Sequence, residues 1–145
     1  LTAPGLDISP TEDLEASAAW ADIISCATLS EAPLIRGGWL KPGVHLDLVG
    51  AFRADMRESD DAAMARARLF VDTRAGALSE AGDILLAIEA GAITEDAITT
   101  DLFALTSGAA AGRGDKGEIT LFKSVGAALE DLAAACLVYK RCNAS

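Results

Sequence analysis

The sequence predicts an α/β fold in which helices flank a parallel β-sheet. Short apolar runs alternate along the chain with segments of helical pattern, which is the order of βαβ units. Apolar residues make up 51% of the 145 residues, enough for the core of about one domain. The clearest strand ends in small residues, and in an open α/β sheet the ligand lies outside the carboxyl ends of the strands. These observations predict a ligand-binding sheet edge.

That clearest strand is predicted for residues 44–49. It follows the turn residues Lys41, Pro42 and Gly43, since Pro fixes φ and Gly lets the chain redirect. Alternate positions should face opposite sides of the sheet. One predicted face is apolar and the other is mixed: Val44, Leu46 and Leu48 against His45, Asp47 and Val49.

The other elements are expected on both sides of this strand. Ser9, Pro10 and Glu12 form a helix-start pattern, with Ser9 as N-cap, and predict a helix that ends near Ala19. Further strands are predicted over residues 21–28, 67–72 and 118–123. Further helices are predicted from residue 59, over 74–90 and 94–105, and from 124 to the end, with a short helical turn within 30–40 and a glycine-rich loop over 107–117.

This pattern resembles only part of a dinucleotide-binding fold. Three central strands and a late fourth make a thin sheet, and no G-x-G-x-x-G follows any strand. The chain also starts at Leu1 rather than Met. We therefore expect the later part of such a fold, a fragment lacking its first βαβ unit, with further residues upstream of Leu1.

Composition restricts the class of partner. The net charge of −10 argues against nucleic acid and anionic membranes, and no apolar run reaches the roughly 18 residues of a membrane helix. The three cysteines, Cys26, Cys136 and Cys142, are an odd number without a close pair, which favours a reducing, cytoplasmic location. With a single histidine, we expect no metal site.

Four motifs, in order along nearly the whole chain, resemble the ornithine cyclodeaminase/mu-crystallin family. They are ADIISCAT at 21–28, WLKPGVH running to VGA at 39–51, MRE at 56–58 with Asp60 and later EAGD at 80–83, and TLFKSVG at 120–126 with LED at 129–131. The resemblance implies a Rossmann-type parallel sheet with flanking helices over 1–124, and over 125–145 a helix that returns to a substrate-binding and dimerisation domain. It places the family's catalytic Lys and Arg upstream of Leu1, and implies a homodimer through that other domain.

The resemblance also implies site residues. It assigns cofactor binding to Thr28, Leu29, Val49, Gly50, Ala51, Lys123 and Ser124. It assigns contact with the small-molecule substrate to Glu80 and Lys123. The cofactor would be NAD or NADP, with a slight preference for NADPH.

Each of these residues also has a plain structural interpretation. The hydroxyl of Thr28 could bond the backbone at a strand end, and Lys123 could be a solvated lysine. Ser124 could cap the last helix, and Glu80 could be a solvated helix acid. Outside the assigned set, His45 is interpreted as a hydrogen-bonded core histidine, and Asp55, Arg57 and Glu58 as ion-pairing or capping groups in a loop.

One position departs from the cyclodeaminases of the family. Those enzymes resemble Val-Gly-Gly-Asp where this chain has Val49-Gly50-Ala51-Phe52, and their Asp is the acid/base for ammonia loss. A phenyl ring cannot transfer a proton. The resemblance then favours an NAD(P)H-dependent reductase of a cyclic imino acid, of the type that converts Δ1-pyrroline-2-carboxylate to L-proline. The alternatives are an ornithine cyclodeaminase that uses another acid, and a non-catalytic protein that binds NADPH and a ligand, as mu-crystallin does.

Overall fold

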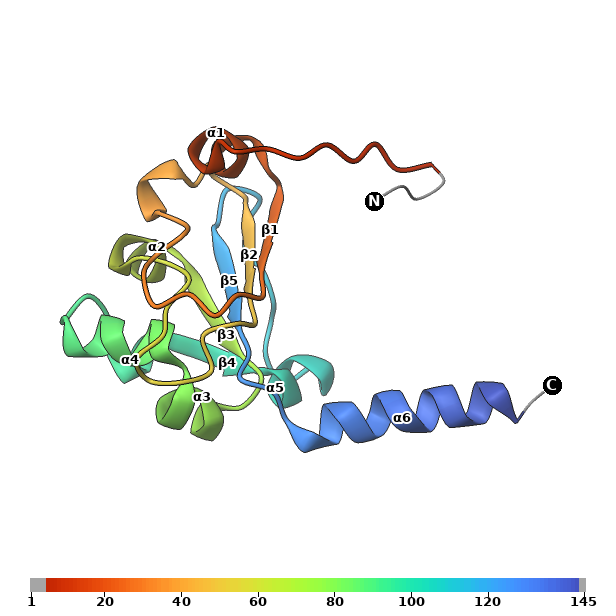
Figure 1. Ribbon diagram of the computed structural model, residues 1–145. Helices are drawn as coiled ribbons and strands as arrows, with labels where there is room; N and C mark the ends of the chain where they lie inside the picture. The colour runs from red at the N-terminus through yellow and green to blue at the C-terminus, as the bar shows by residue number, and fades with distance from the viewer. Residues whose placement is uncertain (1–4, 144–145) are drawn as a thin grey trace.

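The computed structural model describes residues 5–143 and contains a five-stranded, all-parallel sheet (Figure 1). The strand order across the sheet is β1-β2-β5-β3-β4. The strands are β1 Ile23–Cys26, β2 His45–Leu48, β3 Arg68–Val71, β4 Ile98–Asp101 and β5 Thr120–Lys123. The predicted α/β class is confirmed, and each of the four predicted strands is present within its expected range.

Helices and short 3-10 turns connect the strands. They are α1 Leu14–Trp20, η1 Gly37–Trp39, α2 Asp61–Arg66, α3 Arg74–Glu80, α4 Gly82–Glu89, η2 Glu95–Ala97, α5 Leu102–Thr106 and α6 Ala128–Cys142. In Figure 1, α2, α3 and α4 lie on one side of the sheet. Small residues of these helices, such as Ala63 and Ala77, are fully buried, so the helices pack closely on the sheet.

The two faces of the sheet differ as the alternation in β2 predicts. Val44, Leu46 and Leu48 have no exposed surface and join Leu121 of β5 in the core beneath the helices. On the opposite face, His45 and Asp47 are half-buried and Val49 is 43% exposed. The turn before β2 is also confirmed, with Gly43 at a φ of 84° that favours glycine.

Two local predictions were wrong. The first helix does not begin at Ser9: its N-cap is Asp13, whose carboxylate accepts the backbone N–H of Ala16 at 2.9 Å. The predicted helix over 94–105 contains a strand instead, β4, which pairs with β3. The Ile-Thr-Thr run of β4 has β-branched side chains, and pairing with β3 decides between helix and strand.

The predicted helix over 74–90 is two helices, α3 and α4, that meet at Ala81. The break places Gly82 against the loop that follows β2. A Cβ atom on Gly82 would lie 1.9 Å from the carbonyl oxygen of Met56 and 2.3 Å from that of Arg53. Only glycine permits this approach, and it brings the N-terminus of α4 to the loop.

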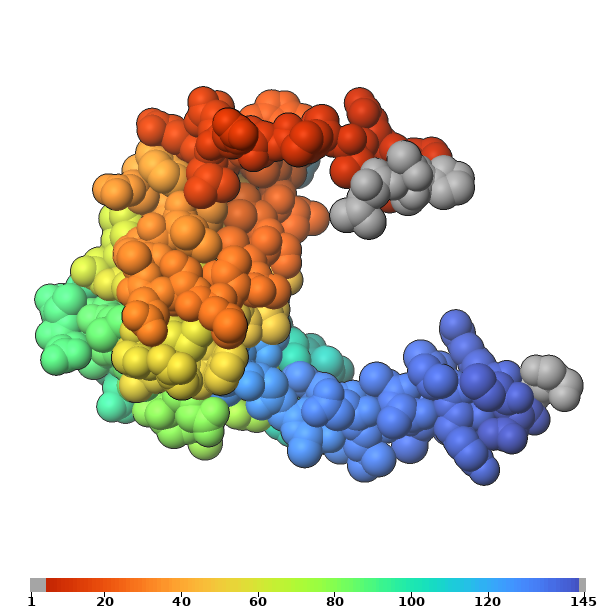
Figure 2. All heavy atoms as spheres, viewed as in Figure 1, coloured from red at the N-terminus to blue at the C-terminus, as the bar shows by residue number. Residues whose placement is uncertain are grey.

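Figure 2 shows the N-terminal segment and α6 projecting from the same side of the body, with a hollow between them. α6 carries large apolar side chains that are more than half exposed: Leu129, Leu132, Leu137, Val138 and Tyr139. Ile23 of the edge strand β1 is 69% exposed as well. Apolar surface of this extent is typical of regions that contact another domain or chain.

We expect the isolated chain of residues 1–145 to self-associate. In the described part of the chain, one edge of β1 has no neighbouring strand and the apolar side chains of α6 are uncovered, and both features promote association. Gel filtration with light scattering and thermal unfolding followed by circular dichroism check this expectation. Replacing Leu129 and Leu132 together by Ser should reduce the association. A sharp, cooperative melt of an unmodified monomer would contradict it.

Candidate functional site

The segments with predicted site residues meet at the carboxyl ends of three adjacent strands. Cys26, Leu48 and Lys123 are in register across β1, β2 and β5. Beyond them, the N–H of Val49 donates to the carbonyl of Cys26 at 2.8 Å, and the N–H of Ser124 donates to that of Leu48 at 3.0 Å. Residues 27–29, 49–51 and 123–124 therefore lie at one edge of the sheet, where ligands of open α/β sheets bind.

A buried carboxylate, Glu58, joins the first two of these strand ends. Its Oε1 accepts the backbone N–H and the hydroxyl of Thr28, at 2.6 and 2.8 Å. Its Oε2 accepts the N–H of Gly50 at 2.9 Å. Glu58 has no exposed surface. The interpretation of Glu58 as a loop ion pair was wrong, because its carboxylate is a buried acceptor rather than a surface charge.

Asp83, at the start of α4, holds the backbone of Glu58 in place. Its Oδ1 accepts the N–H groups of Glu58 and Ser59, at 2.9 and 2.8 Å, and the Ser59 hydroxyl at 3.1 Å. Burial raises the pKa of the Asp83 carboxyl, and the nearby Lys123 ammonium and these hydrogen bonds oppose that rise.

Lys123 lies beneath the sheet edge rather than at its surface. Its side chain has no exposed surface, and its Nζ lies 3.5 Å from Oδ2 of Asp83. Within residues 5–143, neither of these two atoms has a hydrogen-bond partner. The interpretation of Lys123 as a solvated lysine was therefore wrong. Its position on β5 points the ammonium into the helix-covered side, toward α4.

The pKa of the Cys26 thiol is affected by its burial and by the nearby charges of Glu58 and Asp83. Burial raises its pKa to about 11, and the carboxylates of Glu58 and Asp83 add to the rise. The thiol therefore stays protonated and is a small core group.

A third buried carboxylate fixes the segment after β5. Oδ2 of Asp72 accepts the Ser124 hydroxyl at 2.9 Å and the N–H groups of Val125 and Gly126 at 2.9 and 2.8 Å. Ser124 does not cap the last helix, since the N-cap of α6 is Ala127. The interpretation of Ser124 as a cap was wrong because three residues separate it from α6, and the first two of them donate to Asp72.

The predicted site residues differ in how accessible they are. Leu29 and Val49 are 74% and 43% exposed, and Thr28 is half-buried. The other predicted cofactor-binding residues are buried: Gly50, Ala51, Lys123 and Ser124. They lie inside the protein at this edge rather than on its surface. Glu80 is exposed at the end of α3. A flat ligand approaching this edge would meet Leu29 and Val49 first, over the small residues that follow.

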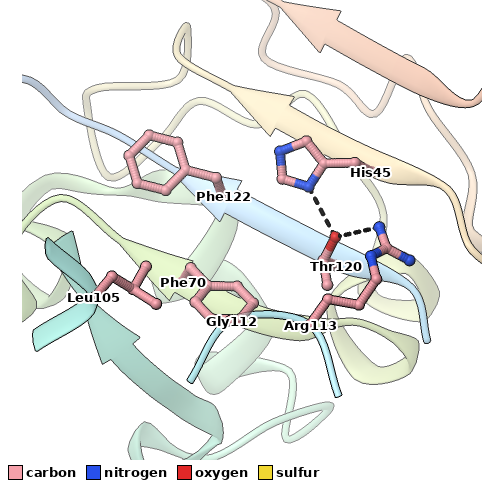
Figure 3. A pocket seen from close by; sticks show the side chains of 7 residues that line it. All are labelled: His45, Phe70, Leu105, Gly112, Arg113, Thr120 and Phe122. Atoms are coloured by element: carbon pink, nitrogen blue, oxygen red, sulfur yellow. Dashed lines mark hydrogen bonds between the residues drawn. The ribbon is translucent and has the colours of Figure 1, made fainter. Parts of the chain in front are cut away.

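A separate pocket lies on the open face of the sheet, near the amino ends of β2 and β5 (Figure 3). Its lining residues are His45, Phe70, Leu105, Gly112, Arg113, Thr120 and Phe122. The Thr120 hydroxyl accepts from Nη2 of Arg113 and lies 2.8 Å from Nδ1 of His45. Burial lowers the pKa of His45, and Asp47 opposes this while Arg113 adds to it. His45 is thus hydrogen-bonded, as predicted, but it is half-buried on the open face of the sheet rather than in the core.

Two further findings concern the described residues 5–143. No group of three or more His, Cys, Asp or Glu side chains there is arranged to hold a metal ion. No helix in that range is long and apolar enough to cross a membrane.

The fold and this edge define a Rossmann-type nucleotide-binding domain. The sequence model of the ornithine cyclodeaminase/mu-crystallin family matches residues 1–145, and the chain belongs to that family. The Δ1-pyrroline-2-carboxylate reductase of Paracoccus denitrificans is 48% identical over 126 residues, covering 87% of this chain and 40% of that protein. Ketimine reductase mu-crystallin of Mus musculus is 42% identical over 133 residues, covering 92% and 40%.

A solved structure is similar as well. It is Thermococcus litoralis Δ1-pyrroline-2-carboxylate reductase in complex with NADH and L-proline, with a TM-score of 0.86 and 38% identity. The match covers 90% of this chain and 40% of that one. The chain thus spans about two fifths of the length of these relatives.

We expect Gly50→Ala to destabilise the protein. A Cβ atom at Gly50 would lie 2.1 Å from the Thr28 carbonyl oxygen and 2.3 Å from Oε1 of Glu58. Forcing a methyl group into such a contact costs about 1–3 kcal/mol of unfolding free energy. Denaturant unfolding of the full-length protein measures the change. Gly38→Ala is the matched control, because no atom lies within 4 Å of its added Cβ. Equal stability of the two variants would contradict the geometry of this edge.

Proposed function

We propose that the protein containing this chain is an NAD(P)H-dependent reductase of a cyclic imino acid, of the type that converts Δ1-pyrroline-2-carboxylate to L-proline. The observation that carries the proposal is Phe52, which stands where the family's cyclodeaminases have their proton-transferring Asp. Phe52 directly follows the buried Gly50 and Ala51 and is 45% exposed, so a ligand at this edge could contact it. Its phenyl ring cannot transfer a proton. Similarity to a reductase bound to NADH and L-proline supports the same class of reaction.

The residues of the edge fit a nicotinamide cofactor. Leu29 and Val49 offer exposed apolar surface to a planar ring, while the Thr28 carbonyl and the Glu58 carboxylate fill the space beside Gly50. When bound, the cofactor would supply the hydride. The chain's own part is to orient the ring and exclude water on one side. Lys123 and Ser124 would act from beneath the edge, since both are buried.

Other parts of the proposal concern the whole protein. Residues 1–124 would form the later part of the Rossmann domain, and residues 125–145 would return to a substrate-binding domain that also forms a homodimer. The exposed apolar side chains of α6 support such docking. The catalytic Lys and Arg would come from that other domain, Glu80 would face the ligand, and the enzyme would act in cytoplasmic proline metabolism. Either NAD or NADP would serve, with NADPH slightly preferred.

The full-length protein tests the reaction. We expect NAD(P)H absorbance to fall when Δ1-pyrroline-2-carboxylate is added, with L-proline as the product and no ammonia from ornithine. Ammonia release from ornithine without net cofactor turnover would instead identify a cyclodeaminase. Tight cofactor binding without turnover of any cyclic imine would identify a binding protein of the mu-crystallin type.

The variant Phe52→Leu tests whether the ring of Phe52 takes part directly in the reaction. A general acid or base contributes about 10²–10⁴-fold to a rate. Because neither side chain can transfer a proton, we expect Phe52→Leu to retain most of the kcat of imine reduction. A loss of about 100-fold or more, measured by steady-state kinetics, would show that the ring has a direct role that this account lacks.

A further inference from the structure

Glu58 is a buried carboxylate whose oxygens bind only groups at the ends of β1 and β2. Its acceptor bonds to Thr28 and Gly50 are 2.6–2.9 Å long. No ion pair of Glu58 occurs among the described residues, whose only buried cation–carboxylate pair joins Lys123 and Asp83. The hydrogen bonds from Thr28 and Gly50 replace the water that a carboxylate loses on burial. Hydrogen bonds to a charged group are also about twice as strong as neutral ones.

The backbone of Glu58 cannot easily shift. Its N–H donates to Asp83, and its carbonyl accepts the N–H groups of Leu34 and Ile35 at 2.9 and 3.0 Å. The space around its carboxylate is equally limited, because Gly50 approaches so closely that a Cβ there would overlap Oε1. Glu58 therefore fixes the distance between the two strand ends from a rigid base.

The residues that Glu58 binds are adjacent in sequence to the two exposed apolar side chains of the edge. Leu29 follows Thr28, and Val49 precedes Gly50. We propose that Glu58 is a positioning residue for the cofactor, which it serves by fixing the spacing of Leu29 and Val49 through Thr28 and Gly50. The identity of the ligand rests on the proposed function, whereas the tether between the strand ends does not.

Glu58→Gln removes one bond of this tether with little change in shape. If the amide oxygen accepts from Thr28, the NH₂ group faces the N–H of Gly50, and two donors oppose each other. The end of β2 is then released. Since a displacement of about 1 Å can cost about 100-fold in rate, we expect kcat for imine reduction to fall at least tenfold. The Kd for NADH should change by a smaller factor, because binding tolerates a small displacement that hydride transfer does not.

The experiment uses the full-length protein and two readouts. Hydrogen exchange without cofactor should become faster in segments 27–29 and 49–51 of Glu58→Gln and stay unchanged in the rest of the sheet. Kinetics and NADH titration should then show the larger effect on kcat.

Asp61→Asn is the control for these measurements. This carboxylate, three residues from Glu58, pairs with Arg57 and does not contact the strand ends, so hydrogen exchange and kinetics of the variant should match wild type. Thr28→Val removes only the hydroxyl donor. It should also lower kcat more than NADH affinity, but by less than Glu58→Gln does, and it replaces Glu58→Gln in the test if that variant does not fold.

If hydrogen exchange in segments 27–29 and 49–51 of Glu58→Gln equals that of wild type, Glu58 does not tether the two strand ends. Faster exchange over the whole sheet, with equal losses in kcat and NADH affinity, would overturn the positioning role in favour of general stability. Wild-type protein that binds neither NADH nor NADPH would reject the proposed function, and with it the cofactor role of Glu58. An active wild type whose Glu58→Gln variant is equally active would reject only the inference about Glu58.

Discussion

The hydrogen bonds from Thr28 and Gly50 to the buried carboxylate of Glu58 are the constraint on which the candidate site depends. Backbone bonds hold these parallel strands together as far as the one between Val49 and Cys26, and the backbone of the residues beyond it needs another partner. Here a single side chain bonds both ends, so the residues that follow β1 and β2 keep a fixed spacing. The exposed side chains of the edge, Leu29 and Val49, depend on that spacing for their placement.

The same edge has a second layer of buried charge. Asp83 holds the backbone of Glu58, and Lys123 lies next to Asp83 at the end of β5. Charges in such a site are costly unless they are paired or hydrogen-bonded. Their arrangement links α4 to the ends of three strands, and a comparable role for Asp72 holds the chain after β5. Buried side chains on the helix-covered side of the sheet thus hold the strand ends that form the candidate site.

The sequence predicted the parts that depend on local pattern. Alternation in β2, the turn before it and four of the five strands follow from the local residue pattern. Tertiary interactions decided the rest: β4 exists because β3 lies beside it, and Lys123 is buried because Asp83 lies next to it. Glu58 was missed because a Glu in a polar loop has the composition of a surface residue. The available signal was that Glu58 and Asp83 both stand within the family's motifs.

A crystal structure of the full-length protein with NADH bound tests the central claim most directly. The account predicts that the cofactor lies along the carboxyl ends of β1 and β2 with its nicotinamide ring against Val49, and that the Glu58 carboxylate is still bound to Thr28 and Gly50. A nicotinamide ring on the opposite part of the sheet, in the pocket beside His45 and Arg113, would contradict the account.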